Sequence, residues 1–152
     1  MDHSTQRATL TAIFEAAVAA AHPAQFLKAA LPAPPASGRL IILAAGKAAG
    51  SMVQVAENHY LDDLGLPASA LKGLAVARKG YGAPTRAVPL IEAGHPVPDD
   101  VSLKAGQNAL VLAQDATVDD LVLVLLSGGA SANWIAPASG LTLDDKRGIN
   151  RA

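Results

Sequence analysis

The 152-residue sequence predicts an α/β fold of Rossmann-like type, a three-layer sandwich with a mostly parallel sheet. Three observations support this class: apolar runs of strand length, helical periodicity between them, and glycine turns where the runs end. The runs at 39–44 and 73–77 suit strands buried on both faces. The run at 121–126 is the clearest strand, and 88–93 is a weaker one. Strands that alternate with helices imply right-handed crossovers and helices on both faces of the sheet.

The segment before the first strand predicts helices and a linker. Apolar residues from Leu10 to Ala21 recur with helical spacing. His22-Pro23 ends or kinks this helix, and a second short helix is expected over 23–31. A Pro/Ala-rich linker follows at 32–38. We therefore assign 1–38 to N-terminal helices and a linker that pack on the domain, and 39–152 to the Rossmann-like domain.

Further helices are expected after the first and third strands and at the end of the chain. One helix spans 47–60, and another runs from Asp99 or Asp100, as its cap, to about residue 113. Residues 142–145 form a good helix start, but the pattern stops after about two turns without a cap. We expect a chain cut inside a helix, a domain incomplete at its C-terminus and a missing second domain. An exposed apolar patch is expected where that domain would dock.

The composition excludes several classes of protein. With 51% hydrophobic and 16% charged residues, the chain can bury a core and is not disordered. A net charge of -1 and 3% aromatic residues provide neither the basic field nor the stacking surface of nucleic-acid binding. The absence of cysteine excludes disulfides, thiolate nucleophiles and cysteine-based metal sites, and fits the cytoplasm. The apolar runs are far shorter than the roughly 20 residues of a membrane span, and the N-terminus does not resemble a signal peptide.

The first strand exit carries Gly46 and Lys47. Glycine here lets backbone N–H groups approach an anion, and the following helix N-terminus adds partial positive charge. Lys47 opposes that helix dipole unless an anion is also bound. The simpler interpretation is a solvated lysine beside small residues that allow helix packing. The loop matches neither a Walker A motif nor a dinucleotide fingerprint, and the second strand exits into Arg78-Lys79 where NAD requires an acid. NADP is disfavoured less than NAD.

The two remaining exits carry further candidates. His95 lies in Gly94-His95-Pro96, where it is either an acid/base or substrate contact, or a turn residue that fixes the loop. Asp99 and Asp100 are most simply acids at a helix start, and the four histidines show no metal-ligand spacing. The fourth strand exits into Ser127, Gly128, Gly129 and Ser131, a predicted nest of backbone donors for a carboxylate or phosphate. A serine nucleophile is the weaker alternative because G-x-S-x-G is absent.

Four ordered motifs together resemble the N-terminal part of the MOFRL-type glycerate 2-kinases. They are Ala45-Gly46-Lys47-Ala48-Ala49, Glu92-Ala93-Gly94-His95-Pro96-Val97-Pro98-Asp99, Leu125-Leu126-Ser127-Gly128-Gly129-Ala130-Ser131-Ala132 and Gly140-Leu141-Thr142-Leu143. The resemblance implies phosphorylation of D-glycerate to 2-phosphoglycerate with ATP and Mg²⁺. Lys47 matches the family's active-site lysine, and the 127–131 backbone would contact substrate or nucleotide. The chain departs from many relatives at Ala130 and Asn133.

Two alternatives remain beside the kinase. Relatives of this family often carry the name hydroxypyruvate reductase, which would be a nicotinamide-dependent enzyme. The other alternative is a non-catalytic fragment that binds a small carboxylate, since an incomplete chain is expected to lack part of its catalytic residues. The sequence leaves open which loop holds ATP and which holds glycerate, and whether the chain forms homo-oligomers.

Overall fold

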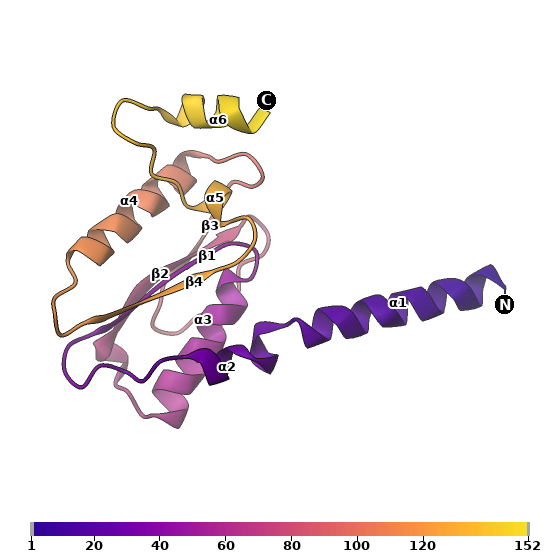
Figure 1. The fold of residues 1–152 in the computed structure, drawn as a ribbon, viewed down its shortest axis with the longest axis horizontal. Helices are drawn as coiled ribbons and strands as arrows, with labels where there is room; N and C mark the ends of the chain where they lie inside the picture. Colours follow the sequence, from indigo (N-terminus) through magenta and orange to yellow (C-terminus); the bar gives the residue numbers. More distant parts are fainter. Residues whose placement is uncertain (1, 152) are drawn as a thin grey trace.

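The computed structural model describes residues 2–151 and confirms the predicted α/β class. Figure 1 shows a twisted sheet with helices on both sides and a long N-terminal helix that projects from it. The elements are α1 (His3–Ala20), η1 (Pro23–Gln25), α2 (Leu27–Ala30), β1 (Leu40–Ala45), α3 (Ala49–Glu57), η2 (Asn58–Asp63), η3 (Ala68–Ala70), β2 (Leu71–Arg78), β3 (Leu90–Ala93), α4 (Asp100–Gln114), β4 (Leu121–Leu126), α5 (Ala130–Asn133) and α6 (Leu143–Arg151).

The four strands form one parallel sheet in the order β3-β2-β1-β4. Strand β1 is central: Leu40 pairs with Leu71 of β2 on one side and with Leu121 of β4 on the other. The predicted βαβ unit is present as β1-α3-β2, and the second unit runs β3-α4-β4. Because β4 lies on the far side of β1 from β2, the exits of β1 and β4 border the point where the strand order reverses.

The core lies on both faces of β1, whose six residues are all buried. Alternate side chains point to opposite faces. Ile42 and Ala44 contribute to the cluster that α3 covers, while Ile41 and Leu43 contribute to the cluster under α4. This two-sided burial explains why the strand reads as a continuous apolar run.

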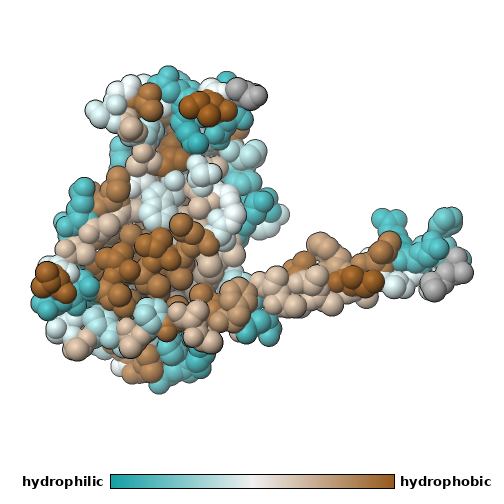
Figure 2. Space-filling model, in the orientation of Figure 1, coloured by the Kyte–Doolittle hydropathy of each residue, from teal (hydrophilic) through white to brown (hydrophobic). Residues whose placement is uncertain are grey.

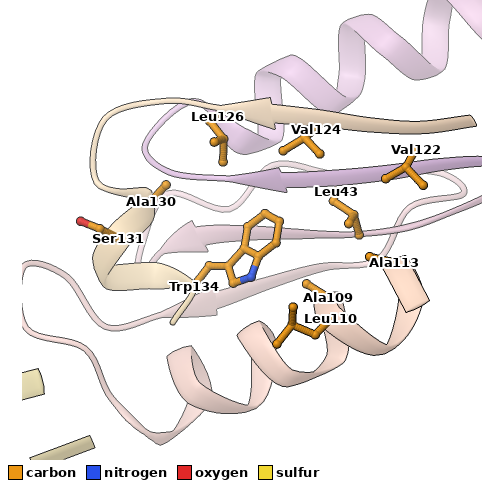
Figure 3. Close-up of a pocket in the computed structure, with 10 residues that line it drawn as sticks. All are labelled: Leu43, Ala109, Leu110, Ala113, Val122, Val124, Leu126, Ala130, Ser131 and Trp134. Carbon is orange, nitrogen blue, oxygen red and sulfur yellow. The ribbon is translucent and has the colours of Figure 1, made fainter. Parts of the chain in front are cut away.

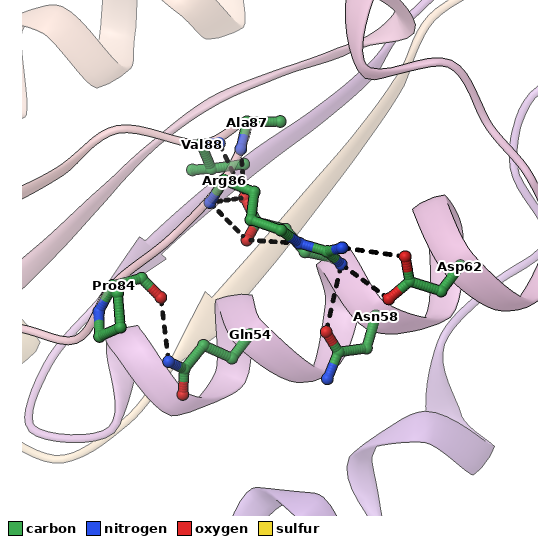
Figure 4. Close-up of polar contacts among 8 residues, drawn as sticks. Gln54, Asn58, Asp62, Pro84, Arg86, Ala87 and Val88 are labelled. Carbon is green, nitrogen blue, oxygen red and sulfur yellow. Dashed lines mark hydrogen bonds and ion pairs between the residues drawn. The ribbon is translucent and has the colours of Figure 1, made fainter.

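One buried carboxylate fixes the connection between β2 and β3. Glu57, at the end of α3, is 1% exposed and accepts backbone N–H groups from Arg86, Ala87 and Val88 at 2.7–3.0 Å. The Arg86 guanidinium reaches back to Asp62 at 2.9 and 3.0 Å (Figure 4). These contacts replace the packing that a crossover helix would supply, because the chain between β2 and β3 contains no helix.

The N-terminal segment differs from the prediction. Helix α1 forms, capped by Asp2, whose carboxylate accepts the Thr5 N–H at 2.8 Å, but none of its residues is buried. Leu10 and Phe14 of its apolar stripe are 67% and 68% exposed. The expectation that this helix packs on the domain is therefore wrong in this structure (Figures 1 and 2). The contacts to the domain come instead from the following segment, where Leu27 and Leu31 pack on the core and Tyr60 donates to the Pro32 carbonyl at 2.8 Å.

An apolar groove opens beside β4; the sequence led us to expect exposed apolar surface but did not give its position. Helix α4 covers the central strands, and the side chains of β4 that point to the same face extend beyond it. Val124 and Leu126 are 50% and 62% exposed, and Figure 2 shows apolar surface over this strand. The groove has a volume of about 470 Å³ (Figure 3). Its lining comprises Leu43, Ala109, Leu110, Ala113, Val122, Val124, Leu126, Ala130, Ser131 and Trp134.

No helix between residues 2 and 151 combines the length and apolar character that crossing a membrane requires.

Candidate functional site

A ligand site is expected between the exits of β1 and β4. In open parallel sheets, ligands bind beyond the carboxyl ends of strands where the strand order reverses. Here that position lies between the 46–48 turn, which leaves β1, and the 127–129 turn, which leaves β4. Both turns were predicted to bind an anion, and the structure distinguishes them.

The β1 exit has little backbone donor capacity left for a ligand. Gly46 has φ +112°, and a side chain there would collide with the Ser127 carbonyl oxygen, so glycine is required. The prediction that N–H groups of this turn approach an anion is wrong for four successive residues. Each of these N–H groups already donates a hydrogen bond to an acceptor within the protein. Gly46 donates to Val76 O (3.1 Å), Lys47 to Gly128 O (2.9 Å), Ala48 to Ser127 Oγ (2.9 Å) and Ala49 to Gly46 O (3.2 Å).

Lys47 lies before the helix and not in its first turn. Helix α3 begins at Ala49 with Ala48 as its N-cap, two residues later than predicted. The expected conflict between the Lys47 charge and the first turn is therefore reduced. The side chain is exposed, and it forms no ion pair with any residue from 2 to 151. Its ammonium group remains available for an anion.

The β4 exit retains the donors that the β1 exit lacks. Gly129 has φ +94°, a left-handed conformation that glycine adopts without cost. Within the described chain, no hydrogen bond uses the backbone N–H of Gly128 or Gly129. The Ser127 N–H, in contrast, continues the sheet by donating to Ala45 O at 3.0 Å. Two adjacent glycine N–H groups are thus left for a carboxylate or phosphate oxygen.

Three of the predicted residues meet at Gly129. A methyl group placed on this glycine would lie 2.8 Å from His95 Nε2 and 3.5 Å from Lys47 Cγ. His95 comes from the β3 exit, Lys47 from the β1 exit and Gly129 from the β4 exit. The half-buried imidazole and the Lys47 side chain therefore lie beside the Gly129 backbone, in the turn that carries the two free N–H groups. We call these four residues, Lys47, His95, Gly128 and Gly129, the strand-exit site.

The two predicted serines differ in their contacts. The Ser127 hydroxyl accepts the Ala48 N–H and donates to Ala45 O at 3.4 Å, so it links the two turns. Ser131 lies in α5, and its hydroxyl points away from the apolar groove (Figure 3). Ser127 is thus a structural residue of the site.

A buried asparagine, Asn133, contacts the backbone just before His95. Asn133 is fully buried, and its Nδ2 donates to Gly94 O at 3.0 Å and to Ala93 O at 3.4 Å. These bonds hold the start of the His95 loop against α5.

Asp99 is a helix cap, as predicted, and is not free to bind a metal. It caps α4 through a capping box with Ser102, and its carboxylate pairs with Lys79 Nζ at 2.8 Å. Burial raises the pKa of Asp99, but hydrogen bonds from Lys79, Ser102 and Gly94 outweigh it and hold the pKa well below its usual range. Across residues 2–151, no three His, Asp or Glu side chains are grouped to hold a metal ion.

Sequence reasoning did not assign a role to several basic residues near His95. Arg78 and Lys79 were noted only because they replace the acid of an NAD site. Arg147 and Arg151, on α6, gave no signal, because nothing in the sequence places that helix beside the 94–98 loop. All four line a cleft that His95 also borders.

Comparison with known proteins gives consistent matches. The model of a family described as "Domain of unknown function (DUF4147)" matches residues 9–152. A putative hydroxypyruvate reductase of Agrobacterium vitis is 38% identical over 146 residues, which cover 96% of this chain and 32% of that protein. A glycerate 2-kinase of Pyrococcus horikoshii is 37% identical over 108 residues, which cover 71% of this chain and 23% of that protein.

A solved structure matches the fold. The crystal structure of glycerate kinase from Thermotoga maritima superposes with a TM-score of 0.72 at 28% identity, over 96% of this chain and 34% of that one. These matches confirm the family resemblance carried by the four sequence motifs. The chain spans about a third of the length of the proteins it matches.

Proposed function

We propose that this chain, which belongs to the family described as a domain of unknown function (DUF4147), serves in a glycerate 2-kinase. Such an enzyme transfers the terminal phosphoryl group of ATP to D-glycerate and forms 2-phosphoglycerate. The observation that carries the proposal is the strand-exit site, where Lys47 and His95 lie beside the turn that carries two free glycine N–H groups. A lysine and backbone donors suit a reaction whose reactants are all anionic.

The strand-exit site offers the groups that phosphoryl transfer needs. In the reaction, the C2 hydroxyl oxygen of glycerate bonds to the γ-phosphorus, and the bond from that phosphorus to the β–γ bridging oxygen breaks. The Lys47 ammonium and the N–H groups of Gly128 and Gly129 would offset the negative charge on the transferring group. In this proposal, His95 Nε2, which lies beside Gly129, would accept the hydroxyl proton.

Magnesium enters this proposal with the nucleotide. Asp99, the carboxylate that lines the same cleft as His95, is committed to Lys79 and to the cap of α4. The described residues therefore contain no built magnesium site. The Mg²⁺ would arrive bound to the ATP phosphates, and this chain would contact the phosphate oxygens.

Turnover by the gene product expressed to its natural stop codon tests the proposal. We expect ADP from Mg-ATP only when D-glycerate is present. Lys47→Ala should lower that rate about a hundredfold or more, because a charge that stabilises the transition state is lost. Lys72→Ala is the matched control, since it removes an exposed lysine from the opposite end of the sheet. A folded product that forms no glycerate-dependent ADP contradicts the proposal.

Hydroxypyruvate reduction is the second candidate, because relatives at 38% identity carry that name. Two observations weigh against it. A dinucleotide site uses the backbone N–H groups of the first strand-to-helix turn, and here residues 46–49 donate theirs within the protein. The β2 exit also presents Arg78 and Lys79 in place of an acid for the ribose. Oxidation of NADPH that depends on hydroxypyruvate would favour this candidate, and binding of D-glycerate without turnover would favour a non-catalytic fragment.

A further inference from the structure

A second polar cleft lies beside His95, and four of its ten lining residues are arginine or lysine. Three parts of the chain build it: the end of β2, the 94–99 loop after β3, and α6. Its volume is about 540 Å³, within the range of sites that hold small ligands. We call it the basic cleft. Its lining residues are Arg78, Lys79, Gly94, His95, Pro96, Val97, Pro98, Asp99, Arg147 and Arg151.

Helix α6 is held in place over the 94–99 loop. Arg147 Nε donates to Pro98 O at 3.0 Å, and Asn150 Nδ2 donates to Pro96 O at 3.3 Å. The Arg147 Nη1 atom pairs with Asp144 at 3.0 Å. These contacts fix one wall of the cleft and keep the Arg147 side chain at its border.

The cleft carries more positive than negative charge. Four cationic side chains line it, and Asp99 is its one carboxylate. Lys79 pairs with Asp99, and Arg147 pairs with the exposed Asp144. Arg78 forms no ion pair with residues 2–151, and neither does Arg151. An anionic ligand would therefore meet uncompensated charge.

Arg78 is held in place without a hydrogen-bond partner for part of its guanidinium group. Its Cζ lies 3.3 Å from the ring centroid of Tyr81, and its Nε is buried with no acceptor in the described chain. A guanidinium stacked on an aromatic ring is held in a fixed orientation, and its donor fork suits carboxylate or phosphate oxygens. A buried donor that lacks an acceptor is costly, and a ligand oxygen would remove that cost.

We infer that the basic cleft binds a polyphosphate chain, such as that of a nucleoside triphosphate, and that the hydroxy acid binds at the strand-exit site. Arginine favours phosphate because its fork of donors matches phosphate oxygens. The two sites share His95 as a common wall, so a chain in the basic cleft would end near Lys47 and Gly129. This inference rests on the proposed kinase function for the identity of the acceptor, but the binding itself does not depend on turnover.

Calorimetric titration of this chain with inorganic triphosphate, at low salt, tests the inference. We expect binding that Arg78→Gln and Arg147→Gln each weaken about tenfold or more, because each removes a charge-assisted contact. Lys72→Gln is the matched control. It removes one charge from the start of β2, the strand that ends at Arg78, and should change the affinity for triphosphate less than twofold. Thermal melting verifies that all variants fold. Equal affinity in the Arg78→Gln, Arg147→Gln and Lys72→Gln variants would overturn the inference.

A titration with D-glycerate and assays of glycerate-dependent ADP formation separate the ligand classes and the two proposals. If Arg78→Gln weakens D-glycerate binding and leaves triphosphate binding unchanged, the cleft binds a carboxylate and the inference is wrong. If triphosphate binding is lost in Arg78→Gln but the wild type forms no glycerate-dependent ADP, the inference about the basic cleft holds and the kinase proposal fails. If Arg78→Gln phosphorylates glycerate with unchanged KM for ATP, the kinase proposal stands and the cleft inference fails.

Discussion

At the residue scale, glycine is required at two of the strand exits, for a different reason at each. Gly46 must lack a side chain because the Ser127 carbonyl occupies the space where Cβ would stand. Gly129 must adopt a positive φ, and a side chain there would press on the His95 ring. The adjacent Gly128 has neither constraint, since no atom lies within 4 Å of its Cβ position. The pair Gly128 and Gly129 therefore offers an internal comparison.

We predict that Gly129→Ala damages the site more than Gly128→Ala does. Alanine at φ +94° costs about 1–2 kcal/mol of stability, and its methyl group would displace His95. Glycerate-dependent ADP formation should fall about tenfold or more, since a shift of about 1 Å at a reacting group is costly. Steady-state kinetics and urea unfolding of both variants measure the two effects. Equal activity in the two variants would show that His95 needs no support from Gly129.

At the scale of elements, an ion pair joins the start of β1 to the turn before β4. The Asp120 carboxylate, whose side chain is 2% exposed, accepts from Arg39 Nη2 at 2.7 Å and from the Thr117 N–H at 2.8 Å. Hydrogen bonds from Arg39 and Thr117 hold the pKa of Asp120 well below its ordinary value of 3.8. The folded state therefore favours the ionised carboxylate, and this contribution is present at neutral pH.

The same pair predicts how stability depends on pH. Because the pKa is lower in the folded state, its stabilisation is complete above about pH 5 and is lost as the pH falls through 3.8 and below. Asp120→Asn should lower the free energy of unfolding at pH 7 and make it less dependent on pH between about 5 and 2. Asp119→Asn, which removes an exposed neighbouring carboxylate, is the control. Wild type and Asp120→Asn curves that run parallel over this interval would contradict the assignment.

Strands were easier to predict than the limits and partners of helices. The runs at 40–45 and 121–126 are continuous apolar segments, so local composition was enough to place β1 and β4. Local composition did not place the start of α3, because residues about 80 positions later accept hydrogen bonds from the N–H groups of Lys47 and Ala48. The stripe on α1 predicted a helix correctly, but a stripe does not specify which surface covers it.

In the candidate site, too, some features were predictable from the sequence and others were not. Lys47, His95 and the 127–129 turn follow strands, and parallel strands bring their carboxyl ends to one edge, so their meeting was predictable. Which turn keeps free donors depends on hydrogen bonds between the turns, and sequence does not encode these locally. The position of α6 depends on Arg147 and Asn150 reaching the 96–98 carbonyls, which also has no local signal.

At the scale of the whole molecule, the apolar groove beside β4 is the most exposed feature of the sheet. Strand β4 pairs only with β1, so one edge of the sheet and several of its side chains face solvent. We predict that the chain binds a hydrophobic dye and self-associates at high concentration. Leu126→Lys should reduce both, while Val118→Lys should not, because Val118 is exposed but outside the groove. Dye fluorescence and sedimentation measure this; a monomer that binds no dye would refute it.

The central claim is that the strand-exit site transfers a phosphoryl group to glycerate. The most direct measurement is phosphorus NMR of Mg-ATP and D-glycerate with the product of the complete gene, wild type and Lys47→Ala. We predict that a 2-phosphoglycerate signal grows as ADP forms, and that the variant produces it at least about a hundredfold more slowly. A folded wild type that produces no phosphoglycerate, but oxidises NADPH when hydroxypyruvate is added, would contradict it.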